Sequence, residues 1–550
     1  MLKKILLYSS LLSVTLSLKA QTPNVYQPYS FQFYQKFDKY VYDPQTRFHS
    51  SLKPYFADDS LLKAPLDSFF NIGAETRKRS WIRRVVRTQH LIQVNKEDFT
   101  FYGDFLPDYS IGRDLSGNKT TWQDSKGFQF GGTIGKKFSF YTSAYENQAS
   151  FPDFLNRYIQ KTKVVPGQGL SNSYANNSNK NTDYSYVTAI ASYSPNKYVN
   201  FTLGQDKIFI GDGYRSMLLS DFATNYPLFK ITANLGNVQY SAIYTSMQEP
   251  NANRLSYDAG FRKKGGVFHY LDWNVNNRLS FGFFDAVIWA AKDDLGNPRG
   301  FDLNYINPFI FIRPLERNNG SPDNALVGFT SKYKISKGAT VYGQFILDEL
   351  EVKNFISNKG SVRNKWGAQL GVRGANLFNV ERLNYLAEYN VARPFTYTSR
   401  PYGNSNATII GNYGHYSEPL AHPFGANFRE FVTILSYSIS KIDFYGKVNY
   451  GMYGLDLNGD YYGKDIYRTY TSAVKHPGEV DGNGHQIAQG LKTDLLYLDG
   501  RVSYLLNPKY NLRLELGAVV RNESNDLANN QTKWLTFGIR SSFRNLYYDF

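Results

Sequence analysis

The chain has 550 residues, no cysteine and a formal net charge of +16 at pH 7. The absence of cysteine excludes a disulfide scaffold, a cysteine zinc site and a lipid-modified N-terminal cysteine. The chain combines 45 Tyr and 40 Phe residues with a mean hydropathy of −0.45. So many rings in a polar chain do not suit a water-soluble core, but they suit a barrel with an apolar lipid face and a polar lumen.

An export signal is predicted at residues 1–20. Lys3 and Lys4 precede a largely apolar stretch, and Ala20 followed by Gln21 offers a cleavage point. The stretch is too short to cross a bilayer as a helix. Cleavage removes three of the 62 basic residues and leaves 59 against 46 acidic ones. Because the chain is exported, we expect anionic lipopolysaccharide and acidic surface polysaccharide as its partners, and no nucleic acid.

Residues 21–87 are predicted to form a short N-terminal periplasmic segment. The segment is rich in aromatic residues, and its basic residues gather near its end: Arg77, Lys78, Arg79, Arg83, Arg84 and Arg87. The simpler interpretation packs it under the barrel, with its charges facing lipid headgroups or water. The alternative is that it docks to a periplasmic partner.

Residues 88–550 repeat one pattern, in which a strand, a tight polar turn and a second strand are followed by a long polar loop. Near the C-terminus one strand face carries Leu512, Leu514, Leu516, Ala518 and Val520, and the other carries Arg513, Glu515 and Arg521. This alternation suits a wet lumen and a lipid exterior, whereas a β-sandwich rarely buries Arg and Glu. The predicted fold is all-β, a transmembrane outer-membrane antiparallel β-barrel of about 18 strands.

The connections between the predicted strands alternate in length. Tight turns rich in Gly, Asn and Pro supply hairpin geometry, whereas the long connections are at 149–183, 207–227, 248–264, 292–326, 392–428, 454–488 and 522–533. Short turns on one side and long loops on the other are typical of an outer-membrane barrel. At the end of the chain Leu546, Tyr548 and Phe550 alternate, which resembles the C-terminal signature recognised by barrel-insertion machinery.

Several short blocks within residues 130–430 resemble one known family. They are GDGYRSMLLSD at 211–221, NYP at 225–227, HYL at 269–271, INP at 306–308, DNAL at 323–326, YGQ at 342–344, DE at 348–349, EYN at 388–390, RP at 393–394, AHP at 421–423 and GAN at 425–427. Together they make the sequence similar to Wzi-type capsule-assembly outer-membrane β-barrels, and closer still to the Bacteroidota branch that includes the gliding-motility protein RemB. The resemblance implies a barrel with a helical periplasmic N-terminal part, and a role in capsule attachment or in gliding.

Polar residues at strand ends, most of them in these blocks, are expected to converge in the lumen: Asp212, Arg215, Asp221, Asp348, Glu349, Glu388, Arg393 and Glu430. We interpret them as a salt-bridge network that fills and stiffens the barrel. Paired carboxylates can in principle hydrolyse glycosidic bonds, but adjacent arginines lower a carboxylate pKa, which does not suit a general acid. The histidines and glycine turns fit neither a zinc-protease motif nor a phosphate-binding motif. No catalytic residue, metal or cofactor is predicted.

Aromatic and basic residues crowd two of the long loops and are the predicted ligand-binding residues: Tyr397, Arg400, Tyr402, Tyr413, Tyr461, Tyr462 and Arg468. Exposed rings can stack on sugars, and flanking cations can pair with uronates or phosphates. The competing interpretation is ordinary loop packing together with the aromatic girdle at the membrane interface.

The sequence thus predicts a non-catalytic barrel in the outer membrane that supports cell-surface gliding motility, surface polysaccharide attachment or both. Two alternatives stay open. One is an accessory component of a secretion or motility complex that acts through contacts with periplasmic or outer-membrane proteins. The other is a pore.

Overall fold

A computed structural model describes residues 25–74, 80–172, 181–293, 295–300, 303–307, 323–353, 359–399, 410–470, 473 and 482–550. The predicted signal peptide lies outside these residues, as do Arg400 and Tyr402. None of the helices in the described ranges has the length and apolar character needed to cross a membrane.

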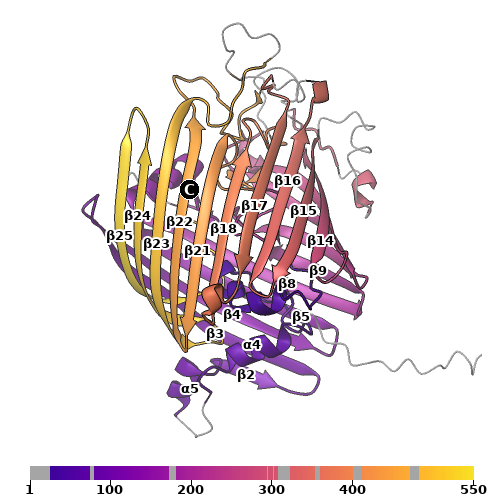
Figure 1. Ribbon diagram of the computed structural model, residues 1–550, viewed down its shortest axis with the longest axis vertical. Coiled ribbons are helices and arrows are strands. Elements are labelled where there is room, and N and C mark those ends of the chain that lie inside the picture. Colours follow the sequence, from indigo (N-terminus) through magenta and orange to yellow (C-terminus); the bar gives the residue numbers. More distant parts are fainter. Residues whose placement is uncertain are drawn as a thin grey trace, which may run out of the picture.

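Eighteen antiparallel strands close into a barrel (Figure 1). They are β3 (Phe99–Asp114), β4 (Lys119–Ile134), β5 (Phe138–Ser150), β8 (Thr182–Asn196), β9 (Val199–Asp206), β11 (Tyr226–Asn234), β12 (Val238–Glu249), β13 (Arg262–Asn274), β14 (Leu279–Ala290), β15 (Asn324–Ser336), β16 (Ala339–Glu349), β17 (Lys365–Gly374), β18 (Leu383–Ala392), β21 (Phe428–Ile439), β22 (Ile442–Leu455), β23 (Leu491–Asn507), β24 (Leu512–Ser524) and β25 (Asn529–Ser541). β25 pairs with β3 to complete the ring. The predicted fold class and strand number are confirmed.

Smaller elements lie before the barrel strands and in the connections between them. They are α2 (Phe31–Tyr34), η1 (Gln35–Phe37), α3 (Asp38–Val41), β1 (Leu52–Lys53), α4 (Lys63–Phe70), α5 (Trp81–Arg87), β2 (Ile92–Asn95), α6 (Asp153–Thr162), β6 (Val164–Val165), β7 (Gly169–Leu170), β10 (Phe209–Ile210), η3 (Tyr257–Ala259), η4 (Leu303–Ile306), η5 (Leu377–Asn379), β19 (Gly414–His415) and β20 (Glu418–Pro419). β2 pairs with the first half of β3 and so extends the sheet at the short-turn end.

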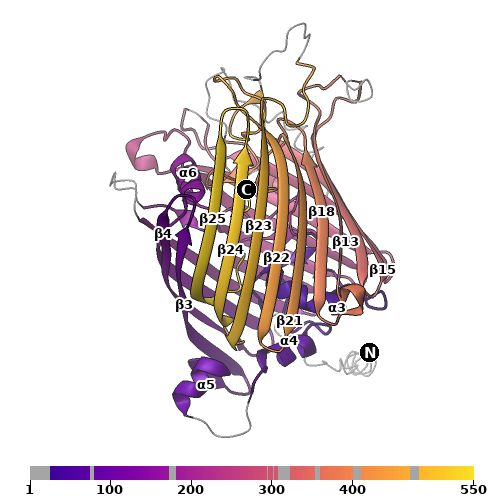
Figure 2. The same cartoon turned by 60° about the vertical axis from the view of Figure 1, so that its left-hand side comes forward.

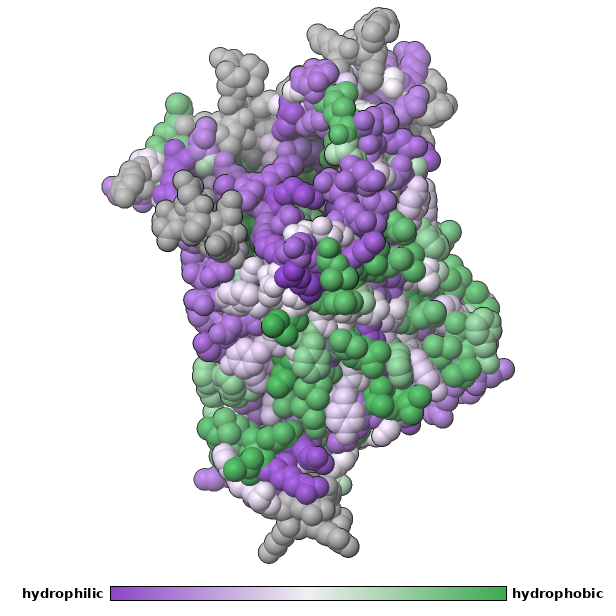
Figure 3. All heavy atoms as spheres, turned by 90° about the vertical axis from the view of Figure 1, so that its left-hand side faces the viewer, coloured by the Kyte–Doolittle hydropathy of each residue, from purple (hydrophilic) through white to green (hydrophobic). Residues whose placement is uncertain are grey.

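The barrel strands alternate as the sequence predicts. On β24 the outward Leu516 is 57% exposed, whereas the inward Glu515 and Arg521 are buried. Because successive side chains point to opposite faces of the sheet, each strand supplies one lipid contact for every lumenal one. Figure 3 shows the result: apolar residues gather over the lower part of the barrel wall, and hydrophilic residues gather above them toward the long loops.

The length of the connections places the two ends of the barrel. Short turns lie at the bottom of Figures 1 and 2, and most long connections lie at the top, as expected of a periplasmic and an extracellular end. Two predictions fail. Residues 522–533 are not a long loop, because only residues 525–528 separate β24 from β25, whereas the long connection at 350–364 was missed. The polar residues at the end of β24 and the start of β25 made this part of the sequence resemble a loop.

The first part of the N-terminal segment lies inside the short-turn end of the barrel and not beneath the barrel, where it was predicted. Asp38 of α3 forms an ion pair of 2.7 Å with Arg373 on β17, and β1 pairs with β10 inside the barrel. The rings of α2 and α4 join a buried core with inward residues of the barrel wall. Many aromatic side chains therefore fill the lumen, whereas the composition predicted that they lie on the lipid face.

The C-terminus also lies inside the barrel. β25 ends at Ser541, and residues 542–550, here called the tail, turn inward. The C-terminal end lies at mid-height in Figures 1 and 2. The last outward stripe is Leu535, Phe537 and Ile539, which are exposed on β25, so residues 546–550 do not continue a membrane strand.

Candidate functional site

The connection from β9 to β11 folds into the lumen and carries the centre of the matched sequence blocks. Every residue from 206 to 226 is buried. Its backbone is held by side chains of the barrel wall: Glu388 accepts the N–H groups of Tyr214 at 2.9 Å and of Arg215 at 3.0 Å. The sequence predicted an outer loop here, because a segment without strand periodicity gives no sign of turning inward.

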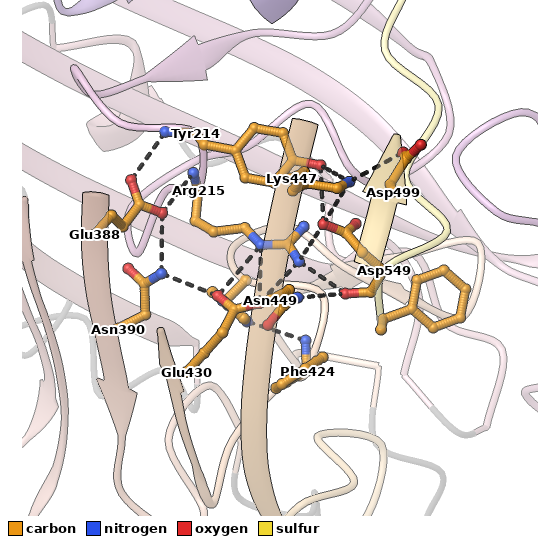
Figure 4. A network of polar contacts seen from close by, with 12 residues as sticks. Tyr214, Arg215, Glu388, Asn390, Phe424, Glu430, Lys447, Asn449, Asp499 and Asp549 are labelled. Atoms are coloured by element: carbon orange, nitrogen blue, oxygen red, sulfur yellow. Dashed lines mark hydrogen bonds and ion pairs between the residues drawn. The ribbon is translucent and has the colours of Figure 1, made fainter. Parts of the chain in front are cut away.

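Arg215 joins three parts of the chain (Figure 4). Its guanidinium lies 2.8 Å from Glu430 of β21 and 3.1 Å from Asp549 of the tail, and all three side chains are almost fully buried. Lys447 on β22 is a second cation for Asp549, at 2.8 Å. In a low-dielectric interior such pairs are stable only when the remaining hydrogen-bonding groups also have partners.

Side chains other than these ion pairs add hydrogen bonds to the network. Asn390 donates hydrogen bonds of 3.0 Å to both Glu388 and Glu430, and His422 lies 2.5 Å from Glu430. The backbone carbonyl of Asp549 accepts from Arg215 and from Asn449, each at 2.9 Å. The carboxylates are thus held by fixed partners rather than presented to a substrate.

The other predicted lumenal residues do not all join this network. Asp212 accepts from Ser50 at 2.5 Å and Ser51 at 2.6 Å, and thereby fastens the N-terminal segment. Asp221 accepts from Asn545 at 2.7 Å and Tyr547 at 2.6 Å, and thereby fastens the tail.

The remaining three predicted lumenal residues hold outer loops. Asp348 accepts the N–H of Tyr397 at 2.8 Å, and Glu349 lies 3.2 Å from Lys365. Arg393 donates to two backbone carbonyls of neighbouring loops. The eight residues therefore divide into a central network, two fastening points and a set of loop contacts.

An open cavity of about 730 Å³ lies at the extracellular end. We call it the vestibule. Its aromatic lining comes from α6, the outer loops, β22 and the end of the tail: Phe154, Tyr158, Phe424, Tyr453, Tyr467 and Phe550. Charged residues of both signs also line it: Arg157, Lys161, Lys464, Arg521, Glu249, Asp456, Asp465 and Glu523. Its size falls within the usual range of ligand pockets.

Three of the predicted ligand-binding rings are buried rather than exposed. Tyr397, Tyr413 and Tyr461 each have 0% exposure. Tyr397 and Tyr413 stack with centroids 5.7 Å apart, and their hydroxyls donate to backbone carbonyls of residues 217 and 218, each at 2.7 Å. These rings pack the loops onto the lumenal segment, so they cannot stack on a sugar in this structure.

Of the other predicted binding residues, Tyr462 and Arg468 lie near the vestibule without lining it, and Arg400 and Tyr402 lie outside the described residues. Tyr462 is half-buried, and Arg468 pairs with Asp456 at 2.9 Å. Helix α6 was not predicted from the sequence. Its signal was the i, i+4 spacing of Phe154, Tyr158 and Thr162 within a stretch read as a loop.

Glu418 on β20 holds several outer segments together. It accepts hydrogen bonds from the N–H of Gly167 at 2.8 Å, the N–H of Thr224 at 3.1 Å and the hydroxyl of Tyr158 at 3.1 Å. Burial raises the pKa of Glu418 to about 7, outweighing these hydrogen bonds and the nearby Lys207, which lower it.

This pKa predicts pH-dependent loop stability. The folded-state pKa of Glu418 lies above its ordinary value of about 4.5, so the protonated side chain contributes fully to stability below about pH 4.5. This contribution is lost as the pH rises through about 7. We expect roughly tenfold faster limited proteolysis of the outer loops at pH 8 than at pH 5. Glu418→Gln should remove most of this difference, since the amide stays neutral, whereas Glu351→Gln on another outer loop should leave it intact. An unchanged pH dependence in Glu418→Gln would contradict the assignment.

Within the part of the chain that the structure describes, no group of three or more His, Asp or Glu residues is arranged to hold a metal ion. His415 and His422, which share one loop, contact different partners: His415 accepts the N–H of Gln248 at 3.0 Å, and His422 contacts Glu430.

Comparison with solved structures places the fold among outer-membrane barrels. Wzi of Escherichia coli, an outer-membrane protein involved in group 1 capsule assembly and described as a carbohydrate-binding β-barrel, superposes with a TM-score of 0.53 and 13% identity over 94% of this chain and 100% of that chain. OprD of Pseudomonas aeruginosa gives a TM-score of 0.42 and 9% identity, over 80% of this chain and 94% of that chain. No family model and no curated protein sequence matches the chain. At this identity the likeness to Wzi shows the fold alone.

Proposed function

We propose that this protein is a non-catalytic outer-membrane barrel that binds surface polysaccharide in its extracellular vestibule. The observation that carries the proposal is the lining of that cavity, where six aromatic rings and charges of both signs border about 730 Å³ of open space. The apolar faces of sugar rings pack on aromatic side chains, while sugar hydroxyls and acidic groups bond to charged ones.

Two further observations support the proposal. Wzi, which has the same fold, is described as a carbohydrate-binding barrel. The lumen beneath the vestibule is filled by residues 206–226, the N-terminal segment and the tail, whose side chains pair with residues of the barrel wall and with one another. A filled lumen favours a surface that binds polymer over a pore that passes solute, and the ion pairs that hold its central carboxylates favour a structural role over hydrolysis.

Substitution of vestibule rings tests the proposal. Tyr467→Ala and Tyr158→Ala should each weaken retention of the organism's own surface polysaccharide roughly five- to tenfold, because each removes a ring available for stacking. Affinity electrophoresis of the purified barrel in gels containing that polysaccharide measures the change. Tyr467→Phe keeps the ring and should bind nearly normally, as should Tyr416→Ala, which alters an outer-loop ring outside the vestibule. Equal retention by all four variants would sink the proposal.

The sequence blocks extend the proposal to cell-surface gliding, because they resemble the branch that includes RemB. A deletion strain scored for both capsule retention and colony spreading separates the two roles. Loss of capsule with normal spreading supports attachment alone, whereas loss of spreading with a normal capsule supports motility through protein contacts. A strain normal in both would contradict both roles.

A further inference from the structure

Helix α5 presents an apolar face that the described residues leave uncovered. At 100° per residue, Trp81, Ile82, Val85 and Val86 cover an arc of about 140°, and the three arginines of the helix cover the opposite arc of about 100°. Trp81 is 57% exposed, Ile82 68% and Val86 42%. Three large apolar side chains exposed on a helix of this length are costly in water.

The helix is fixed to the barrel through its backbone, so the exposed side chains of Trp81, Ile82 and Val86 are available for another contact. Asn507, the last residue of β23, donates to the carbonyl of Val85 at 2.6 Å and to that of Gln89 at 2.9 Å. The hydroxyl of Tyr510 donates to the same Val85 carbonyl at 3.1 Å. The contacts hold α5 at the short-turn end, where Figures 1 and 2 both place it.

Exposed apolar residues lead along the chain from α5 to the lipid-facing surface of the barrel, because Ile92 of β2 is in register with Phe130 of β4 across β3. Leu91 and Ile92, at the start of β2, are exposed. On the neighbouring strands Phe101 lies 6.1 Å from Phe130 and 6.5 Å from Phe140, ring centroid to centroid, and Phe130 is exposed on the outer face. Rings at the strand ends on the lipid face are the girdle expected at a membrane interface.

Charge identifies the occupant. Arg83 and Arg87 are exposed on the polar face of α5, next to an apolar face rich in Trp, Ile and Val. An amphipathic helix with arginines on its polar face is typical of segments that lie in the interface of a membrane with anionic lipids. We infer that α5 lies in the periplasmic leaflet, with Trp81, Ile82 and Val86 among the acyl chains and its arginines on the phosphates of anionic phospholipids.

Spin labelling of the full-length barrel tests this inference. Because the chain has no cysteine, Ile82→Cys can be labelled alone and its depth measured by collision with oxygen and with a water-soluble nickel chelate. In vesicles of phosphatidylcholine with phosphatidylglycerol, the labels at Ile82 and at Leu435→Cys on the barrel wall should both give a lipid-like ratio. Leu527→Cys, at the exposed turn between β24 and β25, is the matched control and should read as water.

A second pair of measurements tests whether the arginines of α5 contribute to its binding to anionic lipid. Arg83→Gln together with Arg87→Gln should lower the lipid-inserted fraction roughly tenfold in vesicles with phosphatidylglycerol and little in phosphatidylcholine alone. A water-like label at Ile82 in both vesicle types would overturn the inference, and protection that appears only when periplasmic extract is added would assign the face to a protein partner instead. Retention of heat-modifiable gel mobility shows that each variant has folded. These results are independent of polysaccharide binding.

Discussion

Deletion of residues 542–550 is expected to convert a closed barrel into an ion-conducting one. The tail runs from the periplasmic rim, where the carbonyl of Ser542 accepts from Asn511 at 2.5 Å, to the vestibule, where Phe550 forms part of the lining. Along the way it borders three interior cavities of about 80, 50 and 40 Å³. Removing the tail should join these spaces to the vestibule and leave a polar, water-filled path.

The truncated barrel should still close, because β25 ends at Ser541 and its pairing with β3 uses only residues 534–539. Planar bilayer recordings should therefore show stable single-channel steps for the truncated chain, with a mean conductance at least about tenfold above that of the full chain. Asp549→Asn, which loosens the tail without shortening it, is the matched control and should stay closed. If truncated and full chains conduct equally, the tail does not seal the lumen.

The barrel could be predicted because its strands alternate between lipid-facing and lumenal side chains with a period of two residues. On β24 the alternation of Leu516 with Glu515 reports lipid and lumen directly, and turn residues mark each reversal. The same reasoning placed the long loops near their observed bounds, except at 350–364 and 522–533. Strand number and topology follow from such local signals, since each strand pairs with its neighbours in the chain.

The contents of the barrel could not be predicted, because contacts across the lumen leave no local pattern. Tyr397 and Tyr413 have the composition of an exposed binding loop, yet they bury their rings against the segment that carries Arg215. Asp549 lies at the end of the chain and contacts Arg215 more than 300 residues away. Arg215, Glu388 and Glu430 were predicted to be lumenal, the first two from the matched blocks, but neither their partners nor the site of the vestibule could be predicted.

Arg215→Met is expected to destabilise the barrel more than other single substitutions in its interior. The methionine roughly preserves volume, but it leaves Glu430 without its guanidinium and Asp549 with Lys447 alone. Removing one partner of a buried ion pair typically costs about 3–5 kcal/mol, because the remaining charge is left uncompensated. The midpoint of urea unfolding in lipid vesicles, followed by gel mobility and tryptophan fluorescence, measures this loss.

The companion variant separates charge from packing. If the cost arises from the uncompensated carboxylate, Arg215→Met combined with Glu430→Met should be more stable than Arg215→Met alone by about 1–3 kcal/mol, although it carries one more substitution. The guanidinium carbon of Arg215 lies 4.8 Å from the ring centroid of Tyr214. If the cost came only from the loss of this packing, the losses of stability caused by the two substitutions would instead be additive. Additive losses would show that Arg215 acts as a filler of the lumen, whereas recovery in the double variant would show that it acts as the shared cation of β21 and the tail.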